Sequence, residues 1–531
     1  MRDLVDWAEA EPEIEICALI IHPAPQTTTK GLRKFFEIGR KQGLYTALSR
    51  TAFALLVKIE GAVFMRAAFN RERLAFYPIG ARVQTHIVTK PEVSTSGFVY
   101  RFSDEDVERV RALDADLLIR CGNGILKGPI LSVAKHGVIS VHHGDNRMNR
   151  GGPAGFWEVL ERQPYTGFIV QRLTDELDGG EVLCRGNITT DILYLRNQTI
   201  LYERSGVYLK KTIRNILTGD VKPEAPLLYD NRLYKTPLAL DSMRYGLKTA
   251  GMLARKAIRK ALGIRWQWGV GYLFGDWSNA VLWRAKTIAN PPGHFLADPF
   301  AFEHEGEHFI FLEDFVYSEQ KGVVSVYRVT TTRSEYLGVA VSESFHLSFP
   351  FVFRFEGGIY MVPESSTNRD MRLYKATDFP LEWELVDILM SDISAVDTII
   401  FPKDGRWHLL TTINPTQVGS NDAELCLFSS DTPLGGWQPH PSNPVVMDAS
   451  KGRNAGLVRR GTEIYRLAQR HGFAQYGKGT TIYRVDDLET YSETKIQDID
   501  PNFLPGIKGT HHLHHDRGLT VFDYVRNMKP D

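Results

Sequence analysis

The chain has 531 residues, more than one hydrophobic core usually serves, so two or three domains are expected. Its 63 basic and 63 acidic residues cancel, which excludes the global positive field that draws a protein to nucleic acid. With 43% hydrophobic residues there is ample material for packed cores. The composition is typical of a soluble globular protein with no nucleic-acid partner.

The first half of the chain alternates strand-like and helix-like segments. Strands are predicted at 13–21, 115–120 and 137–143. Helices are predicted at 31–48 and at 104–114, the second with Ser103 as its N-cap. This alternation predicts an α/β fold with a mostly parallel sheet and helices on its faces.

The four cysteines and the N-terminus bear on the compartment. Cys17, Cys121, Cys184 and Cys426 lie far apart without a C-x-x-C pattern, which predicts reduced, buried thiols rather than a zinc site. The first residues are acidic where a signal peptide is basic, and no apolar run reaches the ~18 residues of a spanning helix. We therefore expect a cytoplasmic location.

A basic segment, residues 241–268, follows the first half. It has seven Lys or Arg residues against the single acid Asp241, on a mostly helical pattern with Trp266 and Trp268 at one end. Such a helix suits weak contact with an anionic membrane surface. The alternative is a linker helix between two domains, which Gly246 and Gly251 favour because glycine weakens helices.

The second half repeats a unit of strand, glycine turn and strand. The turn glycines are Gly306, Gly357, Gly405, Gly461 and Gly518. Their spacing is near the length of a four-stranded propeller blade, so five copies predict a five-bladed β-propeller in which one strand of each blade lines a central channel. A β-sandwich with chance hairpins is the alternative.

Residues 114–183 resemble the catalytic core of the formyltransferases that use 10-formyltetrahydrofolate. The matching parts, in the family's order, are Gly122 to Leu126, Gly137 to His142, Arg150 with Gly151, Pro153 and Trp157, Thr166 with Gly167, and Asp178 with Gly180. The resemblance implies a Rossmann-like domain that binds 10-formyltetrahydrofolate as formyl donor. It also implies a folate-binding loop made of Gly122, Asn123, Gly124, Ile125 and Leu126.

Formyl transfer to an amine passes through an oxyanion, so it needs hydrogen-bond donors and a base. The resemblance assigns these roles to His142 and to Asp178, which would hold the imidazole charged. Ser140 stands where the family has an Asn that holds the formyl oxygen, and Asn146 or Asn123 is the candidate for the missing amide. Asn146 and Arg150 are the expected substrate contacts of this domain.

Residues 276–528 resemble the five-bladed propeller at the N-terminus of plant glucosamine inositolphosphorylceramide transferases, which is itself similar to furanosidase and arabinanase glycosidases. Asp298 and Asp397 stand at the starts of predicted inner strands, and Glu313 and Glu364 follow seven residues after their turn glycines. Carboxylates across a channel hydrolyse a glycosidic bond or simply bind sugar hydroxyls, and we favour binding. His512 and His514 share a strand face but lack further ligands, so no metal site is predicted.

Together these observations predict a formyltransferase-like α/β domain at 1–218, a basic linker with a helix at 219–275 and a five-bladed propeller at 276–531. The predicted function is transfer of a formyl group from 10-formyltetrahydrofolate to an amino sugar of glycan or sugar-nucleotide biosynthesis, with the propeller binding the saccharide. The alternative is a glycan-binding or glycan-processing propeller whose first domain is catalytically altered. The sequence does not fix the oligomeric state.

Overall fold

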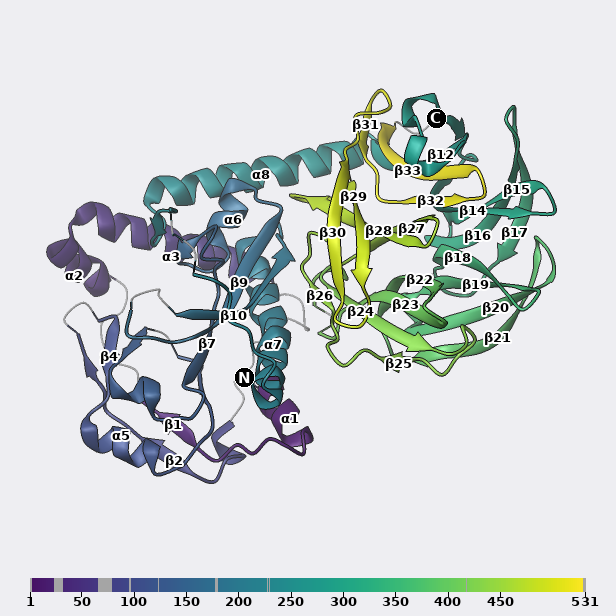
Figure 1. Cartoon of the computed structure of the whole chain (residues 1–531). Coiled ribbons are helices and arrows are strands. Elements are labelled where there is room, and N and C mark those ends of the chain that lie inside the picture. The colour runs from purple at the N-terminus through teal and green to yellow at the C-terminus, as the bar shows by residue number, and fades with distance from the viewer. Residues whose placement is uncertain are drawn as a thin grey trace. The chain divides into compact units, whose positions relative to one another are not determined.

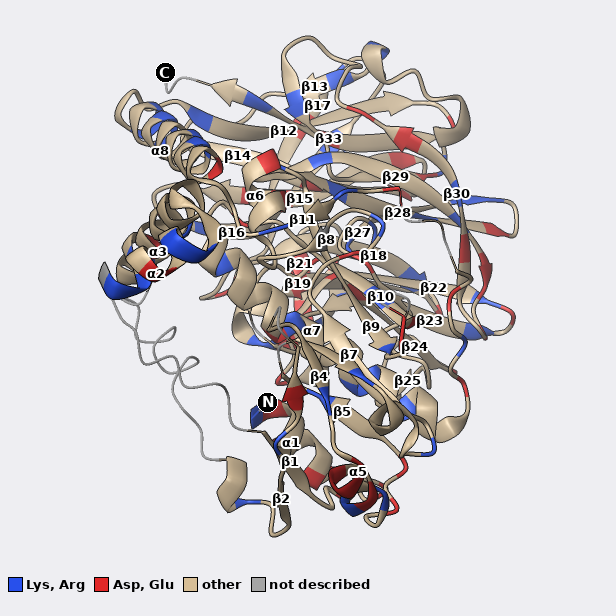
Figure 2. Cartoon of the chain, turned by 90° about the vertical axis from the view of Figure 1, so that its left-hand side faces the viewer, with Lys and Arg blue, Asp and Glu red and all other residues tan. Residues whose placement is uncertain are grey.

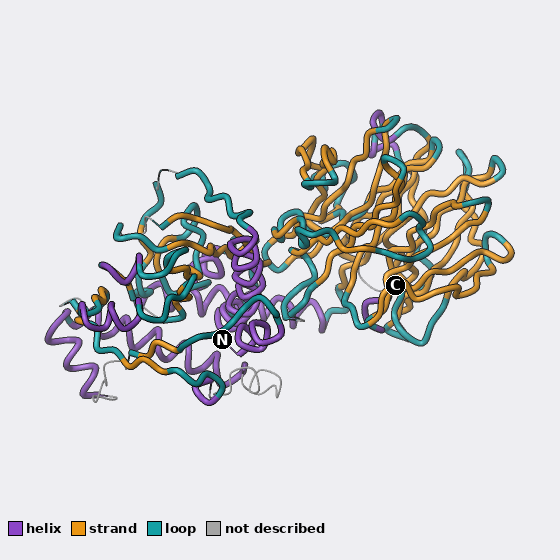
Figure 3. The backbone as a smooth tube through the Cα atoms, turned by 60° about the horizontal axis from the view of Figure 1, so that its bottom comes forward, coloured by secondary structure: helices purple, strands orange, loops and turns teal. Residues whose placement is uncertain are grey.

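The computed structural model of the chain divides into two compact units, Met1–Gly251 and Met252–Asp531 (Figure 1). It describes residues 2–22, 32–64, 79–94, 97–122, 124–176, 180–226, 228, 230–416 and 418–528. Figure 3 shows helices gathered in the first unit and strands dominating the second. The predicted order of a helix-plus-strand region followed by a strand-rich region is confirmed.

Helices make up much of the N-terminal unit. They are α1 (Arg2–Ala10), α2 (Leu32–Gln42), α3 (Leu44–Phe64), α5 (Asp104–Arg111), α6 (Phe156–Glu161), α7 (Tyr194–Thr218) and α8 (Ala239–Ala261), the last running across the boundary between the units. The predicted helix at 31–48 is found as α2 and the start of α3. The predicted cap is confirmed, because the Ser103 hydroxyl accepts a hydrogen bond from the Asp106 amide at 3.2 Å.

The described strands of this unit form four small sheets. These are β1 (Leu19–Ile21) with β2 (His86–Val88); β3 (Glu92–Val93), β4 (Val99–Arg101) and β6 (Ile125–Lys127); β10 (Glu181–Thr189), β9 (Tyr165–Arg172), β7 (Val138–His142) and β5 (Leu118–Arg120); and β11 (Leu233–Tyr234) with β8 (Arg150–Gly151). The pairs β1–β2, β4–β6 and β5–β7 are parallel, whereas β9 is antiparallel to β7 and β10. The single, mostly parallel sheet predicted from the sequence is thus not what these strands form.

A buried carboxylate ties three helices of the N-terminal unit together. Glu60 of α3 accepts hydrogen bonds from the first amides of α7, those of Tyr194 at 2.9 Å and Leu195 at 3.1 Å. The Tyr245 hydroxyl of α8 donates to the same carboxylate at 2.7 Å. Burial raises the pKa of Glu60, and these donors compensate for taking a carboxyl group out of water at a helix N-terminus.

The described strands of the C-terminal unit form five antiparallel sheets. Their strands are β14 (His294–His304), β15 (Glu307–Val316), β16 (Lys321–Val329) and β17 (Ser334–Val341); β18 (Ser348–Phe355), β19 (Gly358–Ser365), β20 (Asp370–Asp378) and β21 (Glu382–Ser391); β22 (Ala395–Lys403), β23 (Arg406–Ile413), β24 (Glu424–Ser430), β25 (Gln438–Pro439) and β26 (Val446–Met447); β27 (Asn454–Arg460), β28 (Glu463–Gly472), β29 (Gln475–Asp487) and β30 (Ser492–Ile499); and β12 (Arg265–Phe274), β13 (Lys286–Ile288), β31 (Ile507–Gly509), β32 (Leu513–Asp516) and β33 (Leu519–Met528).

The five predicted glycine turns are all present. They connect β14 to β15, β18 to β19, β22 to β23, β27 to β28 and β32 to β33. Each glycine has a positive φ, between 60° and 85°, which suits glycine because it lacks a Cβ. The periodic glycines therefore identified real hairpins.

The first strands of these five hairpins contact one another in a cycle. β14 contacts β18, β18 contacts β22, β22 contacts β27, β27 contacts β32, and β32 returns to β14. We call these five the inner strands. The last sheet is completed by β12, which pairs with β33 along its whole length, from Arg265 opposite Met528 to Phe274 opposite Leu519. Trp266 and Trp268, expected at a helix end, lie in β12 within the predicted linker.

Three of the inner strands carry the same local irregularity near their starts. The strand register shifts at Asp298, Phe349 and Asp397, and each of these residues has a positive φ, between 44° and 51°. In β27 the shift falls at Gly456, whose φ is also positive. A β-bulge of this kind re-aims the side chain at that position.

The expectation of buried cysteines is wrong for two of the four. Cys17 and Cys121 are exposed, Cys184 is half-buried and Cys426 is buried. The first two lie beside rather than within short strands, so the apolar runs around them did not imply burial. Among the described residues, no helix is long and apolar enough to cross a membrane.

The β12–β33 pairing predicts the effect of truncation. Deleting residues 519–531 removes β33 and leaves β12, β31 and β32 without their partner, so we expect the whole C-terminal unit to lose cooperative folding. Deleting only residues 529–531 keeps every strand pair of β33 and serves as the control. Circular dichroism melting distinguishes the two, and a longer deletion that melts like the parent would contradict the closed cycle.

Candidate functional site

In the N-terminal unit, His142 is the last residue of β7, at the carboxyl end of a strand between β5 and β9. A Cβ placed on Gly144 would lie 3.3 Å from His142 Nε2, so the chain turns tightly against this ring. The next residue, His143, packs instead on α7, with Nε2 3.1 Å from the Ser205 hydroxyl. Burial, and next the neighbouring His142, lower the pKa of His143 to about 4, so it is neutral at physiological pH.

Ser140 lies two residues before His142 on the same strand. Its hydroxyl is 3.3 Å from the Arg120 carbonyl oxygen and 3.4 Å from the Val141 carbonyl oxygen, and it donates toward these backbone acceptors. A hydroxyl has one proton, so this donor is already committed to the sheet. Ser140 therefore does not offer the free hydrogen-bond donor that the family's Asn provides at this position.

Asn146 belongs to a buried polar network beside β10. Arg185 donates from Nη1 to Asn146 Oδ1 at 3.0 Å, and Nη1 also contacts the Asp145 carboxylate. Arg185 Nη2 pairs with Glu224 at 2.9 Å. A Cβ on Gly167 would lie 2.5 Å from the Asp145 Cβ, so glycine is required there for the loop to approach the sheet. This network holds the loop after His142.

The predicted folate loop leads into β6. Gly124 has a φ of +88°, and a Cβ there would meet the Tyr100 ring at 2.4 Å, so no other residue fits. Gly122 approaches His22, and Ile125 and Leu126 pair with β4. Asn123 and Asp178 lie outside the described residues. Arg150 is described only through its backbone, which forms β8.

In the C-terminal unit, the four predicted carboxylates come together. Asp298 and Asp397 lie at the bulges of β14 and β22, and Glu313 and Glu364 lie on the adjacent strands β15 and β19. Their charges act on one another, and the Asp397 amide donates to Glu364 Oε2 at 3.3 Å. We call these four residues the carboxylate cluster.

Burial and repulsion raise the pKa of three members of this cluster. Burial, opposed by His511 and assisted by Asp397, raises the pKa of Asp298 to about 7. Burial raises the pKa of Asp397 to about 7 as well, although Arg453 opposes it. The pKa of Glu313 is raised for the same reason, burial first and the neighbouring carboxylates next. At neutral pH the cluster therefore offers both carboxyl donors and carboxylate acceptors.

Arg453 is the main cation of the site. Its Nε donates to Asp397 Oδ2, and its Nη2 lies 3.8 Å from Glu364 Oε2. Gln469 also donates to Asp397 Oδ2, at 2.9 Å. Asp397 is thus occupied by protein donors, an arrangement that suits positioning and recognition better than nucleophilic attack.

A second charged group adjoins the cluster. His511 lies between Asp298 and Asp523, with Nδ1 against Asp523 and Nε2 3.6 Å from Asp298. Although burial lowers it, the two aspartates raise the pKa of His511 above its ordinary value. Its ring stacks on Trp268 with centroids 3.9 Å apart, and Tyr476 packs against its edge.

Asp298, His511 and Asp523 bring one ligand atom each within 4.8 Å of one another, a spacing compatible with a metal ion. Asp523 is already satisfied, because the backbone amides of His511 and His512 donate to Oδ1 at 2.8 and 3.0 Å. The geometry accordingly fits an ion pair that, with these backbone hydrogen bonds, fixes the segment before β32 to Asp523 of β33.

Arg453, His511 and Asp523 are absent from the sites predicted by sequence. Arg453 lies 56 positions from Asp397 and His511 lies 213 positions from Asp298, so no local spacing connects them to the predicted carboxylates. The four histidines between 511 and 515 pointed to this segment in the sequence. Strand alternation, however, drew attention to His512 and His514, which share one face, and not to His511. His512 is instead fully buried between Phe300 and Phe349.

Comparison with known proteins finds relatives of both halves of the chain. Residues 277–512 match the family model described as glucosamine inositolphosphorylceramide transferase 1, N-terminal. The C-terminal unit resembles this family. The protein of that name from Oryza sativa subsp. japonica is 36% identical over 223 residues, covering 40% of this chain and 30% of the relative, and that from Arabidopsis thaliana is 29% identical over 261 residues, covering 43% of this chain and 34% of the relative. The chain thus spans about a third of the length of these relatives.

The N-terminal part is similar to methionyl-tRNA formyltransferases. The Bacillus subtilis enzyme is 26% identical over 211 residues, covering 38% of this chain and 63% of the relative. The catalytic domain of the Coprinopsis cinerea GH62 alpha-L-arabinofuranosidase superposes with a TM-score of 0.36 and 13% identity, over 50% of this chain and 98% of that domain. Both resemblances inferred from the sequence are confirmed, and the relatives found by sequence for each half are named as transferases.

The predicted cytoplasmic location is wrong. It conflicts with the similarity to glucosamine inositolphosphorylceramide transferases, which are Golgi glycosyltransferases. The prediction rested on the cysteine pattern, on the acidic first residues and on the lack of an apolar run, and these features did not determine the compartment.

The raised pKa of Asp298 predicts a pH dependence of stability. Because an unfolded aspartate titrates near 3.9, the folded state holds the proton more tightly, so its stabilising contribution is complete below about pH 4 and is lost as the pH rises to about 7. Asp298→Asn stays neutral and tolerates the positive φ. We expect its unfolding free energy to fall by roughly 2 kcal/mol less than that of the parent between about pH 5 and about pH 8.

Denaturant unfolding at the two pH values measures this difference. The matched control is Asp404→Asn, at an exposed position with a similar positive φ in the β22–β23 turn. Identical pH slopes in the parent and Asp298→Asn would show that Asp298 is ionised throughout.

Proposed function

We propose that the chain is a formyltransferase that moves a formyl group from 10-formyltetrahydrofolate to an amino sugar, with the C-terminal unit binding the saccharide. The observation that carries the proposal is His142 at the carboxyl end of β7, within the region that is similar to methionyl-tRNA formyltransferases. In this proposal the N-terminal unit is the Rossmann-like catalytic domain of the family. Its loop from Gly122 to Leu126 binds the folate.

The chemistry assigned to this site needs a donor for the developing oxyanion and an acceptor for the amine proton. His142 is the donor, held charged by Asp178 as the resemblance implies. Ser140 is committed to the Arg120 carbonyl oxygen, so the amide comes from another residue, with Asn123 or Asn146 the candidates. Releasing Asn146 for this role requires Arg185 to give up one hydrogen bond.

The C-terminal unit is proposed to be a closed five-bladed propeller. The proposed domain plan of the chain is 1–218, 219–275 and 276–531, with the difference that β12, inside the predicted linker, belongs to the last sheet of the propeller. The cyclic contacts of the inner strands and the β12–β33 pairing support the closed propeller. The carboxylate cluster, with Glu313 and Glu364 beside Asp298 and Asp397, then binds sugar hydroxyls, because carboxyl groups of mixed protonation both donate and accept. Arg453 and Gln469 on Asp397 favour binding over hydrolysis.

The second candidate function is glycan binding or processing without formyl transfer. The commitment of the Ser140 hydroxyl favours it, since the family's amide is missing from its usual place. In that case the carboxylate cluster is the active part of the chain, and the N-terminal unit binds folate weakly or not at all.

Substitution of the two histidines separates these candidates. His142→Ala should lower formyl transfer by ~100-fold or more with little change in melting temperature, because it removes a group that acts on the reacting atoms. His143→Ala should show the reverse pattern, since it loses the Ser205 contact and the packing on Tyr202. The assay follows the mass gained by amino-sugar nucleotides.

Ser140→Asn provides the second arm of the same assay. It should preserve or raise formyl transfer, because it restores an amide donor. Full activity in His142→Ala would refute the site, and loss of activity in Ser140→Asn would assign the serine to a different reaction.

We also propose that α8 rests on an anionic membrane surface. One face of α8 packs on the N-terminal unit through Ser242 and Tyr245. Another exposes an apolar stripe at helical spacing, Leu240, Met243, Leu247 and Ile258, each more than half exposed. Lys and Arg residues run along the same helix (Figure 2). An apolar stripe with basic flanks favours anionic lipid over a second copy of the chain, since two such basic faces would repel.

Vesicle sedimentation tests this contact. Leu247→Glu with Ile258→Glu should abolish binding to vesicles that contain phosphatidylserine, because both carboxylates would enter the apolar interface. Leu253→Glu, on an exposed position away from the stripe, is the control and should still bind. Equal sedimentation of all three proteins would refute the contact.

A further inference from the structure

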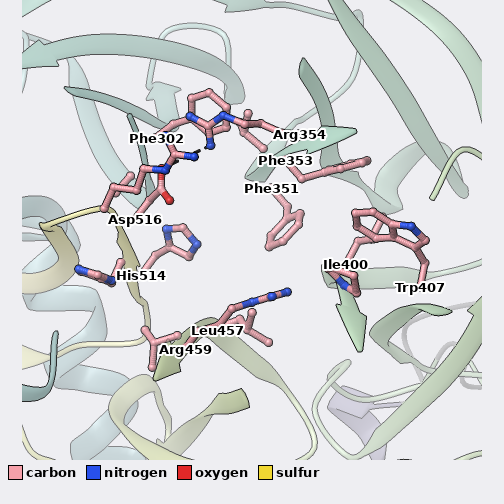
Figure 4. Close-up of a pocket in the computed structure, with 16 residues that line it drawn as sticks. Phe302, Phe351, Phe353, Arg354, Ile400, Trp407, Leu457, Arg459, His514 and Asp516 are labelled. Carbon is pink, nitrogen blue, oxygen red and sulfur yellow. Dashed lines mark ion pairs between the residues drawn. The ribbon is translucent and has the colours of Figure 1, made fainter. Parts of the chain in front are cut away.

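A cavity of about 450 Å³ opens at the end of the inner strands opposite the carboxylate cluster (Figure 4). All five inner strands contribute to its wall, through residues that follow the bulges or their equivalents along each strand: Ala301, Phe353, Ile400, Leu457 and His514 among them. We call it the far pocket.

An apolar layer separates the far pocket from the carboxylate cluster. Phe300 packs edge-on against Phe349 with ring centroids 4.9 Å apart, and His512 contacts both rings at 4.6 and 5.0 Å. All three side chains are at most 1% exposed. Burial lowers the pKa of His512, so the layer is uncharged. The far pocket is therefore a second site with its own surroundings.

One wall of the far pocket is aromatic. Phe353 and Trp407 lie with ring centroids 6.1 Å apart, and Figure 4 shows them across the cavity from His514 and Asp516. Flat aromatic faces bind the C–H faces of sugar rings through dispersion and the hydrophobic effect. The volume lies within the range of small-molecule sites, ~300 to 1,000 Å³.

The other wall carries positive charge that is only partly neutralised. Arg354 lies over the Phe302 ring at 3.9 Å and pairs loosely with Glu303 and Asp516, at 3.9 and 3.7 Å. Arg517 shares Glu303, at 2.5 Å. No ion-pair partner is found for Arg459 within the described part of the chain. Three guanidinium groups thus face two carboxylates.

His514 adds a buried polar atom to this wall. Its side chain is more than nine-tenths buried, and Nδ1 has no hydrogen-bond partner among the described residues. Burial, and next His515 and Arg459, lower the pKa of His514 to about 3, so it is a neutral ring at physiological pH. An unpaired buried nitrogen costs stability unless a ligand satisfies it.

We propose that the far pocket binds a sugar unit that carries an anionic group, either a carboxylate or a phosphate ester, with its ring on Trp407 and its charge on Arg459. This deepens the proposed saccharide binding by the C-terminal unit and rests on it. A neighbouring cavity of about 550 Å³ shares Pro402 and Arg459 and provides space for a second unit of the glycan. Arg459 lies where the two cavities meet.

Titration of the full chain with three sugars, followed by ligand-observed NMR, tests the proposal. Glucuronic acid and glucose 6-phosphate should bind at millimolar concentrations, and glucose should bind at least ~10-fold more weakly, the value of one charge-assisted contact. The tighter of the two acids tells a carboxylate site from a phosphate site. If glucose binds as well as both acids, or neither acid binds, the proposal is overturned.

Variants locate the binding. Arg459→Gln should weaken both acids by ~10-fold, whereas Arg460→Gln, at the next position of β27 and outside the pocket wall, should leave them unchanged. If binding of the acids depends on Asp298 and not on Arg459, the saccharide site is the carboxylate cluster, and the proposal for the far pocket is refuted. Formyl transfer, measured in the same proteins, reports separately on the proposed function.

Discussion

The pairing of β12 with β33 is the constraint on which the C-terminal unit depends. Ten residue pairs join a strand near the start of the unit to its last described strand, so the final sheet contains both ends of the segment. A chain joined in this way returns its last inner strand, β32, to the first, β14. The carboxylate cluster and the far pocket both draw residues from separate inner strands, and both lose their geometry if this sheet opens.

Within that cycle of inner strands, the same β-bulge has two structural roles. A bulge with positive φ occurs at Asp298, Phe349 and Asp397. In two strands it turns a carboxyl group toward the cluster, and in the third it supplies the aromatic ring of the separating layer. Positive φ is unfavourable for phenylalanine, so the packing around Phe349 must stabilise this backbone conformation. The Phe349 side chain is almost completely buried. Sites at the two ends of the inner strands follow from the same repeated geometry.

The sequence predicts those features that are local. Glycine turns and the Ser103 cap appear because a few neighbouring residues determine the backbone there. Trp266 and Trp268 continued an apparently helical pattern, yet they lie in β12, because pairing with a distant strand overrides local propensity. The single parallel sheet expected for the first unit fails for a related reason, since strand order is set by contacts far apart in the chain.

The candidate sites divide in the same way. The four carboxylates were identifiable from their place in the repeat, whereas Arg453, His511 and Asp523 required the folded chain to bring them there. Of the two adjacent histidines, the family resemblance singles out His142, and the structure adds that His143 packs on Ser205 of α7. The match to a formyltransferase then gives His142 its proposed role, with the carbohydrate-related resemblance of the second unit suggesting the acceptor.

Hydrogen–deuterium exchange of the full chain with and without 10-formyltetrahydrofolate tests the central claim most directly, because it locates the donor without assuming an acceptor. The account predicts slower amide exchange in the loop from Gly122 to Leu126 and at the end of β7 near His142, with no change around the carboxylate cluster. Unchanged exchange in both N-terminal segments at saturating folate would contradict it.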